Sequence, residues 1–198
     1  MDLNFPIKLV FKLFAFVPQI FIYDMAGNEK MYIYQRYWKI KEKIEIFSNS
    51  KREQKLYEIN ADRIIDFSPI FTITNATGAK VGAIKRYGMK SILKGYYEIM
   101  DSTDKTLYKI VELNPLIKFI EGILNDIPFV GIFLGLFLHP KYAVQQVDSS
   151  TEVARIEKSR SFAERIFNAT ESDSINKEHK ELIAISMIMI ALMERRRG

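Results

Sequence analysis

The stretch Ile70-Phe-Thr-Ile-Thr-Asn-Ala-Thr-Gly-Ala-Lys-Val-Gly-Ala-Ile-Lys85 decides the fold of this chain. Apolar and polar residues alternate on both sides of Asn75–Gly78, and this period of two predicts two half-buried β-strands. The Asn and Gly between them are typical of a tight turn. The stretch therefore predicts one antiparallel hairpin.

The same pattern occurs six times along the chain. The other turns lie at residues 24–27, 48–51, 101–104, 148–151 and around Asp173. Successive turns are about 24 to 27 residues apart, except for one step of about 47, and such a period indicates an architecture built from repeats. The long step is one repeat with roughly 21 residues inserted.

The repeats predict about twelve strands, rich in Ile, Tyr, Phe and Val. The expected strands are Ile7–Phe11, Ile20–Tyr23, Met31–Gln35, Lys43–Phe47, Lys55–Ile59, Ile70–Thr74, Lys80–Lys85, Tyr96–Met100, Thr106–Val111, Tyr142–Val147, Glu152–Ile156 and Arg165–Asn168. Many short, evenly spaced strands predict a closed antiparallel barrel, because closure leaves no exposed strand edge.

The C-terminal segment predicts a helix instead. Leu182–Met193 is apolar on every face apart from Ser186, and Asp173 or Ser174 is the expected N-cap. Twelve helical residues span about 18 Å against roughly 30 Å of bilayer hydrocarbon, which favours a buried helix over a membrane span. A wide barrel would be hollow without a filling, so we expect a mainly β (α+β) fold with this helix at its centre.

We expect a single domain over residues 1–198, with an insertion at about 115–139. Its first half has an amphipathic helical pattern, and its second half, 127–138, carries no charge. Prolines, glycines and three charged residues argue against a membrane span here. The sequence leaves open whether the insertion enters a membrane, caps the barrel or mediates oligomerisation.

Composition limits the class of protein. The chain has 198 residues, of which 48% are hydrophobic, which is enough for one large core. It has no cysteine, so disulfides and thiolate metal sites are excluded and a cytoplasmic location is expected. The apolar stretch Met1–Tyr23 shows no cleavage site and suits a strand better than a signal peptide. The net charge of +5 mildly favours anionic partners.

We find no catalytic constellation and expect a non-enzymatic protein without metal or cofactor. His139 and His179 are the only histidines, and forty residues separate them. No phosphate-binding loop or nucleophile elbow is present in the sequence. Asp24, Asp101 and Asp148 lie in separate hairpins, where turn chemistry explains them without calcium.

Charge divides between the two ends of the expected barrel. All six turns lie at one end, the turn end, and sum to a negative charge. The connectors 36–41, 60–68, 86–95, 112–140 and 157–164 lie at the other, the connector end, and sum to a positive charge. A helix that threads the barrel would end at the connector end and bring its arginine tail there. The apolar insertion is one of the connectors and lies at the same end.

This coincidence of basic and apolar residues predicts a membrane contact, where each basic residue adds about 1 kcal/mol near anionic lipid. The candidate contact residues are Arg36, Trp38, Lys39, Arg86, Lys90, Lys94, Phe129, Phe133, Phe137, Arg195, Arg196 and Arg197. Trp38 and its neighbour Tyr37 suit a membrane interface. The competing interpretation is a charged, solvated surface with the insertion as a cap or oligomer contact.

Three stretches carry a family resemblance: Phe21–Gly27, Phe71–Gly78 followed by Val81–Lys85, and Tyr97–Asp101. Together with the apolar C-terminal helix, this recurring phrase resembles the LURP-one-related proteins of the Tubby-like superfamily, which are related to phospholipid scramblases. The resemblance covers nearly the whole chain apart from the insertion. It implies a twelve-stranded barrel around a central helix and a link to membrane phospholipid, but it carries over no binding residue.

The leading hypothesis is therefore a non-enzymatic, lipid- or membrane-associated binding module, cytoplasmic or peripheral at the membrane, that docks to anionic phospholipid. A soluble protein-interaction scaffold with residues 115–139 as a homo-oligomer interface is an alternative. Scramblase-like lipid translocation is a further alternative, by analogy alone. No nucleic-acid partner is expected, because no strand face is clearly loaded with exposed aromatic residues.

Overall fold

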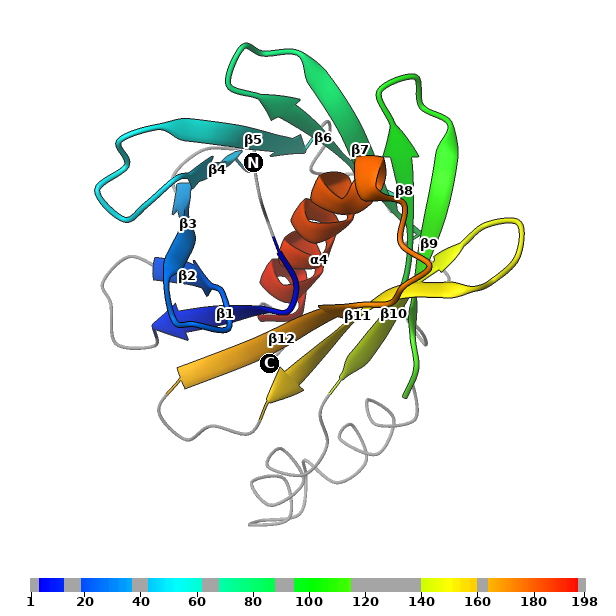
Figure 1. Ribbon diagram of the computed structural model, residues 1–198. Helices are drawn as coiled ribbons and strands as arrows, with labels where there is room; N and C mark the ends of the chain where they lie inside the picture. The colour runs from blue at the N-terminus through cyan, green and yellow to red at the C-terminus, as the bar shows by residue number, and fades with distance from the viewer. Residues whose placement is uncertain are drawn as a thin grey trace, which may run out of the picture.

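A computed structural model describes residues 4–12, 19–36, 43–61, 68–87, 95–114, 140–159 and 164–195. Twelve antiparallel strands form one closed barrel, and a single α-helix runs through its centre (Figure 1). The sequence-based expectation of a mainly β barrel filled by the C-terminal helix is confirmed. The insertion at about 115–139 lies outside the described residues.

The strands follow one another around the barrel in chain order. They are β1 (Ile7–Lys12), β2 (Gln19–Tyr23), β3 (Glu29–Arg36), β4 (Lys43–Phe47), β5 (Lys55–Ala61), β6 (Ile70–Asn75), β7 (Lys80–Arg86), β8 (Tyr96–Asp101), β9 (Thr106–Glu112), β10 (Lys141–Gln146), β11 (Glu152–Ser159) and β12 (Glu164–Glu171). Every predicted strand is present, with ends that differ by a few residues.

Pairing between β1 and β12 closes the barrel. Leu9 of β1 lies opposite Ile22 of β2 on one side and Phe167 of β12 on the other, and all three are buried. Because side chains alternate between the two faces of a strand, this register sends the apolar set of each strand inward. The closed order leaves none of the twelve strands with an unpaired edge.

The turns that join the hairpins share one construction. Gly27 and Gly78 both have a φ of +84°, a left-handed conformation that glycine adopts without steric cost. The Asp101 carboxylate accepts hydrogen bonds from the backbone N–H groups of Thr103 (2.8 Å) and Lys105 (3.0 Å). The Asn75 side chain caps its turn in the same way. Asp101 therefore has the structural use in its turn that the sequence predicts.

The C-terminal helix begins later than expected. Asn176 caps a 3₁₀ turn, η1 (Lys177–His179), by accepting a hydrogen bond from the Glu178 N–H, and α4 (Lys180–Arg195) follows. The prediction of Asp173 or Ser174 as N-cap is wrong, because residues 172–176 first form the turn that brings the chain from β12 into the barrel.

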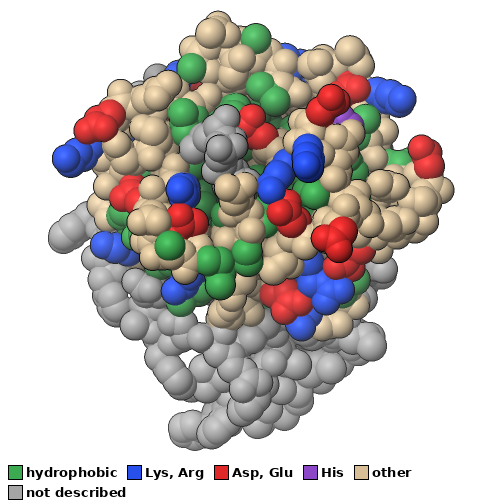
Figure 2. Space-filling model, in the orientation of Figure 1, with side chains coloured by type: hydrophobic (Ala, Val, Ile, Leu, Met, Phe, Trp, Pro, Cys, Tyr) green, Lys and Arg blue, Asp and Glu red, His purple; other side chains and the backbone are tan. Residues whose placement is uncertain are grey.

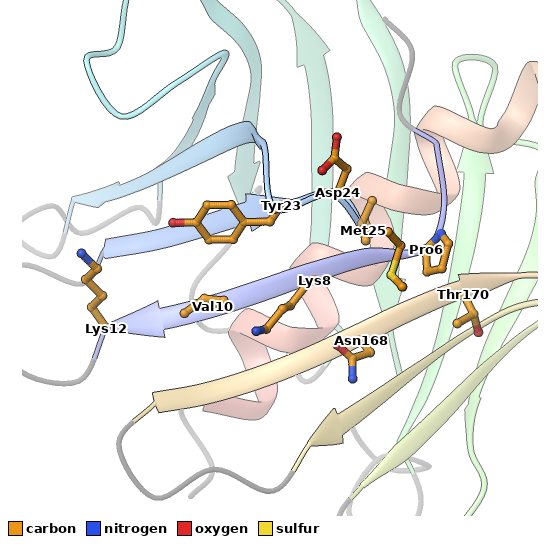
Figure 3. Close-up of a pocket in the computed structure, with 11 residues that line it drawn as sticks. Pro6, Lys8, Val10, Lys12, Tyr23, Asp24, Met25, Asn168 and Thr170 are labelled. Atoms are coloured by element: carbon orange, nitrogen blue, oxygen red, sulfur yellow. The ribbon is translucent and has the colours of Figure 1, made fainter.

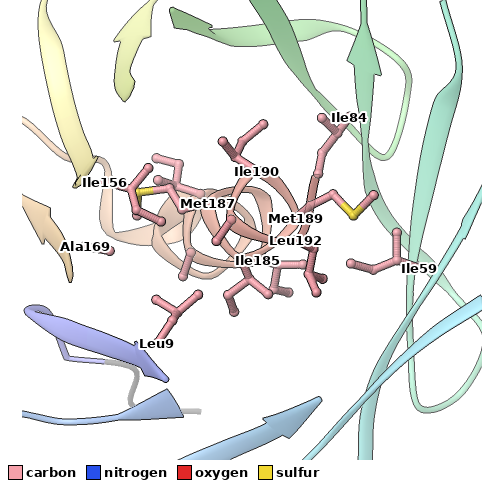
Figure 4. Close-up of a cluster of buried hydrophobic side chains, with 14 of the residues drawn as sticks. Leu9, Ile59, Ile84, Ile156, Ala169, Ile185, Met187, Met189, Ile190 and Leu192 are labelled. Atoms are coloured by element: carbon pink, nitrogen blue, oxygen red, sulfur yellow. The ribbon is translucent and has the colours of Figure 1, made fainter. Parts of the chain in front are cut away.

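Residues 182–193 of α4 are buried on all sides. Their exposed fractions are at most 8%, and most are 0 or 1%. Figure 4 shows Leu9, Ile59, Ile84, Ile156 and Ala169 of the barrel around Ile185, Met187, Met189, Ile190 and Leu192 of the helix. Each large apolar side chain buried in this way contributes roughly 1.5–3 kcal/mol. No helix in the described part of the chain combines the length and apolar character that crossing a bilayer requires.

Polar contacts at both ends fix the direction of α4. At the turn end, the phenol of Tyr57 donates a hydrogen bond to Glu181, and Tyr108 contacts His179 Nδ1 at 2.8 Å. At the connector end, the phenol of Tyr142 donates a hydrogen bond to Glu194. The helix thus enters at the turn end and finishes at the connector end, as the sequence predicts.

Candidate functional site

The predicted lipid-contact residues fall into three groups. Trp38, Lys39, Lys90, Lys94, Phe129, Phe133, Phe137, Arg196 and Arg197 lie outside the described residues. Arg36 is the last residue of β3 and Arg195 the last residue of α4, so the backbone brings both to the connector end. Arg86, the last residue of β7, is described in full.

Arg86 is half-buried at the connector end, and its position in the register faces the barrel interior. It lies opposite Tyr97, which is fully buried, and its backbone N–H donates to the carbonyl of Pro69 at 3.1 Å. Its side-chain Nε is buried, and no described residue supplies a hydrogen-bond acceptor for it. A guanidinium has five donors in a planar fork that suits carboxylate and phosphate oxygens. Arg86 therefore has one buried donor that the described residues leave without an acceptor.

Further inward positions near this end carry polar side chains that the sequence analysis did not single out. Glu112, Tyr142, Lys158 and Arg165 share the inward face with the buried residues Ile110, Ile156 and Phe167, and Glu194 joins them from α4. The sequence pattern that could have identified them is the alternation within each strand. Each of the polar strand residues lies two positions from a buried apolar residue, near the end of its strand, and so faces the same way. The interior thus changes from apolar to polar at the connector end.

Tyr142 lies at the centre of this polar layer. Its ring meets that of Tyr97 edge to face with centroids 6.5 Å apart. Burial raises the pKa of the Tyr142 phenol far above its usual range, and the neighbouring carboxylates of Glu194 and Glu112 raise it further. The phenol therefore remains a neutral hydrogen-bond donor at any physiological pH.

Glu112 has a structural use in the same layer. It is fully buried and accepts a hydrogen bond from the backbone N–H of Gly95 at 2.9 Å. A side chain at position 95 would not fit, since a Cβ there would lie 2.8 Å from the Tyr142 ring. Glu112 thus fixes the backbone where the chain enters β8.

Lysines on the outer wall lie near the connector end as well, and most have partners. Lys43 forms a salt bridge with Glu58 (2.9 Å), and Lys141 forms one with Glu157 (3.1 Å). The ammonium of Lys85 lies 4.8 Å from the centroid of the Tyr87 ring. Figure 2 shows a face at the turn end, where acidic and basic side chains are interspersed without a broad patch of one sign.

The described residues do not form a metal site. No group of His, Cys, Asp and Glu among them is arranged to hold a metal ion. His179 is half-buried rather than exposed, and it packs edge to face against Tyr108 at the turn end, away from the polar layer. His139 lies outside the described residues.

Comparisons with known proteins give information on the fold of this chain but not on its activity. No family model matches the chain, and no curated protein matches it. The X-ray structure of the protein AT5G01750 from Arabidopsis thaliana is similar, with a TM-score of 0.52 and 10% sequence identity over 98% of this chain and 93% of that one. At this identity the likeness shows a shared fold alone. The description of that structure names no activity.

Proposed function

We propose that this chain is a non-enzymatic binding module that docks onto anionic phospholipid through the connector end of its barrel. The observation that carries the proposal is Arg86, whose buried Nε has no acceptor among the described residues at that end. The other N–H donors of this half-buried guanidinium suit a phosphate oxygen of a lipid headgroup.

The course of α4 supports the same surface. The helix ends with Arg195 at the connector end, and two further arginines follow directly in the sequence. Basic residues near an anionic membrane contribute about 1 kcal/mol each, and this contribution falls as salt concentration rises. The apolar segment 127–138 belongs to the connector between β9 and β10 and is the proposed source of apolar contact.

We further propose that the chain is a LURP-one-related member of the Tubby-like superfamily. The support is the barrel with a central helix, which that resemblance implies, and the shared fold with the Arabidopsis protein. In this proposal residues 1–198 form one domain, cytoplasmic and peripheral at the membrane, with 115–139 as an insertion.

Liposome co-sedimentation tests the docking. We expect binding to vesicles of phosphatidylserine and phosphatidylcholine, weakening with salt, and little binding to phosphatidylcholine alone. Arg86→Gln is expected to reduce the affinity about fivefold, which corresponds to about 1 kcal/mol. The matched control is Arg52→Gln, which removes an arginine that stacks on Tyr34 at the turn end and should leave binding unchanged.

Deletion of 127–138 separates docking from the alternative scaffold function. Loss of vesicle binding by a folded deletion variant supports docking. Equal binding to neutral vesicles contradicts it. A concentration-dependent dimer that the deletion converts to a monomer, with vesicle binding absent throughout, would favour an oligomer interface instead.

A further inference from the structure

A groove of about 680 Å³ runs along the outer wall of the barrel over β1, β2 and β12, from Lys12 near the connector end to Met25 at the turn end, on the opposite face of the sheet from the polar layer (Figure 3). It is lined by Pro6, Ile7, Lys8, Val10, Lys12, Tyr23, Asp24, Met25, Gly27, Asn168 and Thr170. This volume lies in the range of pockets that hold small organic ligands. The proposed docking onto phospholipid does not use this groove.

Two lysines of β1 face the groove from the same side of the strand. Lys8 lies directly between Tyr23 of β2 and Asn168 of β12 in the sheet register. The Lys12 ammonium lies 4.8 Å from the centroid of the Phe21 ring, and Phe21 is the register partner of Val10. Lys12 therefore reaches across the sheet to β2, and Figure 3 shows the Lys8 ammonium on the Val10 side of its own backbone.

The one carboxylate in the lining does not cancel this charge. Asp24 accepts hydrogen bonds from the Asn28 backbone (2.8 Å) and side chain (3.1 Å), and forms a salt bridge with Lys30 at 3.2 Å. Figure 3 shows its carboxylate directed away from β1. Because Lys30 compensates Asp24, this carboxylate does not neutralise Lys8 or Lys12.

The apolar part of the lining departs from the repeat. Met25 is 77% exposed at the tip of the first turn, where the equivalent second residue of other turns is Asn49, Ala76, Ser102 or Ser149. Turn chemistry does not call for a large apolar residue at this position. With Pro6 and the aliphatic stem of Lys8, Met25 extends an apolar strip from Val10 to the turn end.

We propose that this groove binds a small amphipathic anion. Its phosphate or carboxylate head lies at the Lys8 ammonium, at the level of Val10, and Lys12 adds positive charge at the same end of the groove. Its apolar body lies along the stem of Lys8 and against Pro6 and Met25. Four residues of strand separate Val10 from Pro6, about 13 Å, which suits a chain of about eight carbons.

Monomeric n-octyl phosphate is the probe, titrated below its micelle concentration into the full chain and followed by calorimetry and by the methionine methyl resonances in NMR. We expect saturable binding that shifts the Met25 methyl signal. Inorganic phosphate, which has the head alone, and 1-octanol, which has the body alone, should each bind at least tenfold more weakly. Anionic vesicles form a separate arm that distinguishes a bilayer lipid from a free amphiphile.

Substitutions test each half of the site. Lys8→Gln and Lys12→Gln should each weaken octyl phosphate binding about fivefold, and the double variant more. Met25→Ser, which restores the residue type of Ser102, should weaken octyl phosphate binding without changing the response to inorganic phosphate. The matched control is Lys105→Gln, in the exposed turn between β8 and β9.

The proposal is overturned if the Lys8/Lys12 double variant binds octyl phosphate as tightly as the native chain, or if inorganic phosphate binds as well as octyl phosphate. Binding to anionic vesicles without binding to monomeric octyl phosphate also overturns it. Retained octyl phosphate binding with no vesicle binding leaves this site intact and contradicts only the docking at the connector end.

Discussion

The phenol of Tyr142, in β10, donates a hydrogen bond to the carboxylate of Glu194, in the last turn of α4. An equivalent bond joins Tyr57 of β5 to Glu181 in the first turn of the helix. Between these two contacts the helix touches the barrel through apolar side chains, which fix its burial but discriminate weakly between depths. The two tyrosine–glutamate pairs therefore set how far the helix is inserted.

Tyr142→Phe should destabilise the fold by about 1.5–3 kcal/mol, the usual range for a buried hydrogen bond to a charged group. The measurement is the free energy of unfolding in urea. Tyr96→Phe is the control, because Tyr96 is half-buried on the outer wall and the contact of its hydroxyl with Glu98 is long, at 3.5 Å. A loss for Tyr142→Phe no larger than that for the control would show that the Tyr142–Glu194 contact does not hold the helix.

Sequence reasoning reached the strands and the helix because both signals are local. Alternation around Asn75–Gly78 and the apolar run 182–193 each specify an element without knowledge of the rest. The predicted N-cap was wrong because residues 173–176 include several side chains that can cap a helix. Which of them does so depends on how the chain turns into the barrel.

The polar layer could not be predicted in the same way. Tyr142 and Glu194 are 52 residues apart in sequence, and their meeting depends on the sheet register and on the depth of the helix together. Arg86 could be predicted as a candidate because the sequence around it is a basic connector. Its inward position depends on the sheet register, and so does the lack of an acceptor for its Nε among the described residues.

Acid should destabilise the barrel partly through Glu58. Partial burial acts to raise the pKa of this carboxyl, but hydrogen bonds from Lys55, Asn60 and Lys43 outweigh it and lower the pKa from 4.5 to about 2. A carboxyl with a lowered pKa stabilises the fold above its unfolded pKa and loses this contribution as pH falls. The loss is therefore expected between about pH 4.5 and 2.

Glu58→Gln removes that titration. We expect about 1–2 kcal/mol less stability at pH 7 and a shallower fall in unfolding free energy between pH 4.5 and 2, measured by urea titrations across this range. The double variant Lys43→Gln/Lys55→Gln removes two of the three donors to Glu58, so the pKa of Glu58 in the folded state should rise. The fall in unfolding free energy between pH 4.5 and 2 should then also be shallower than in the native chain. An unchanged pH profile for Glu58→Gln would contradict this account.

Gly78 and Gly82 lack a side chain for two different structural reasons, which alanine substitutions can separate. Gly78 has a φ of +84° with open space around it, so Gly78→Ala costs only backbone strain, about 1–2 kcal/mol. Gly82 packs closely, since a Cβ there would lie 2.5 Å from the Met100 carbonyl oxygen and 2.8 Å from Leu182 Cδ1. Gly82→Ala should therefore cost more, about 3 kcal/mol, as overpacking forces strand and helix apart.

A double variant distinguishes these mechanisms. Leu182→Ala removes the helix side chain next to Gly82, so it should recover part of the cost of Gly82→Ala but none of that of Gly78→Ala. Thermal and urea unfolding of the single and double variants give the coupling. Coupling of equal size at both glycines would refute the assignment of Gly82 to close helix–strand packing.

Within α4, the one hydroxyl should matter less than its apolar neighbours. Ser186 is fully buried, and its hydroxyl donates to the carbonyl of Leu182 at 2.7 Å, one turn earlier in the same helix. Ser186→Ala removes donor and polar atom together and improves helix propensity, so its effect should lie within about 0.5 kcal/mol. Ile188→Ala, at an equally buried position, should cost about 2–5 kcal/mol because it leaves a cavity against the barrel. Urea unfolding of both variants measures the difference, and similar costs would mean that the helix is not enclosed by the strands.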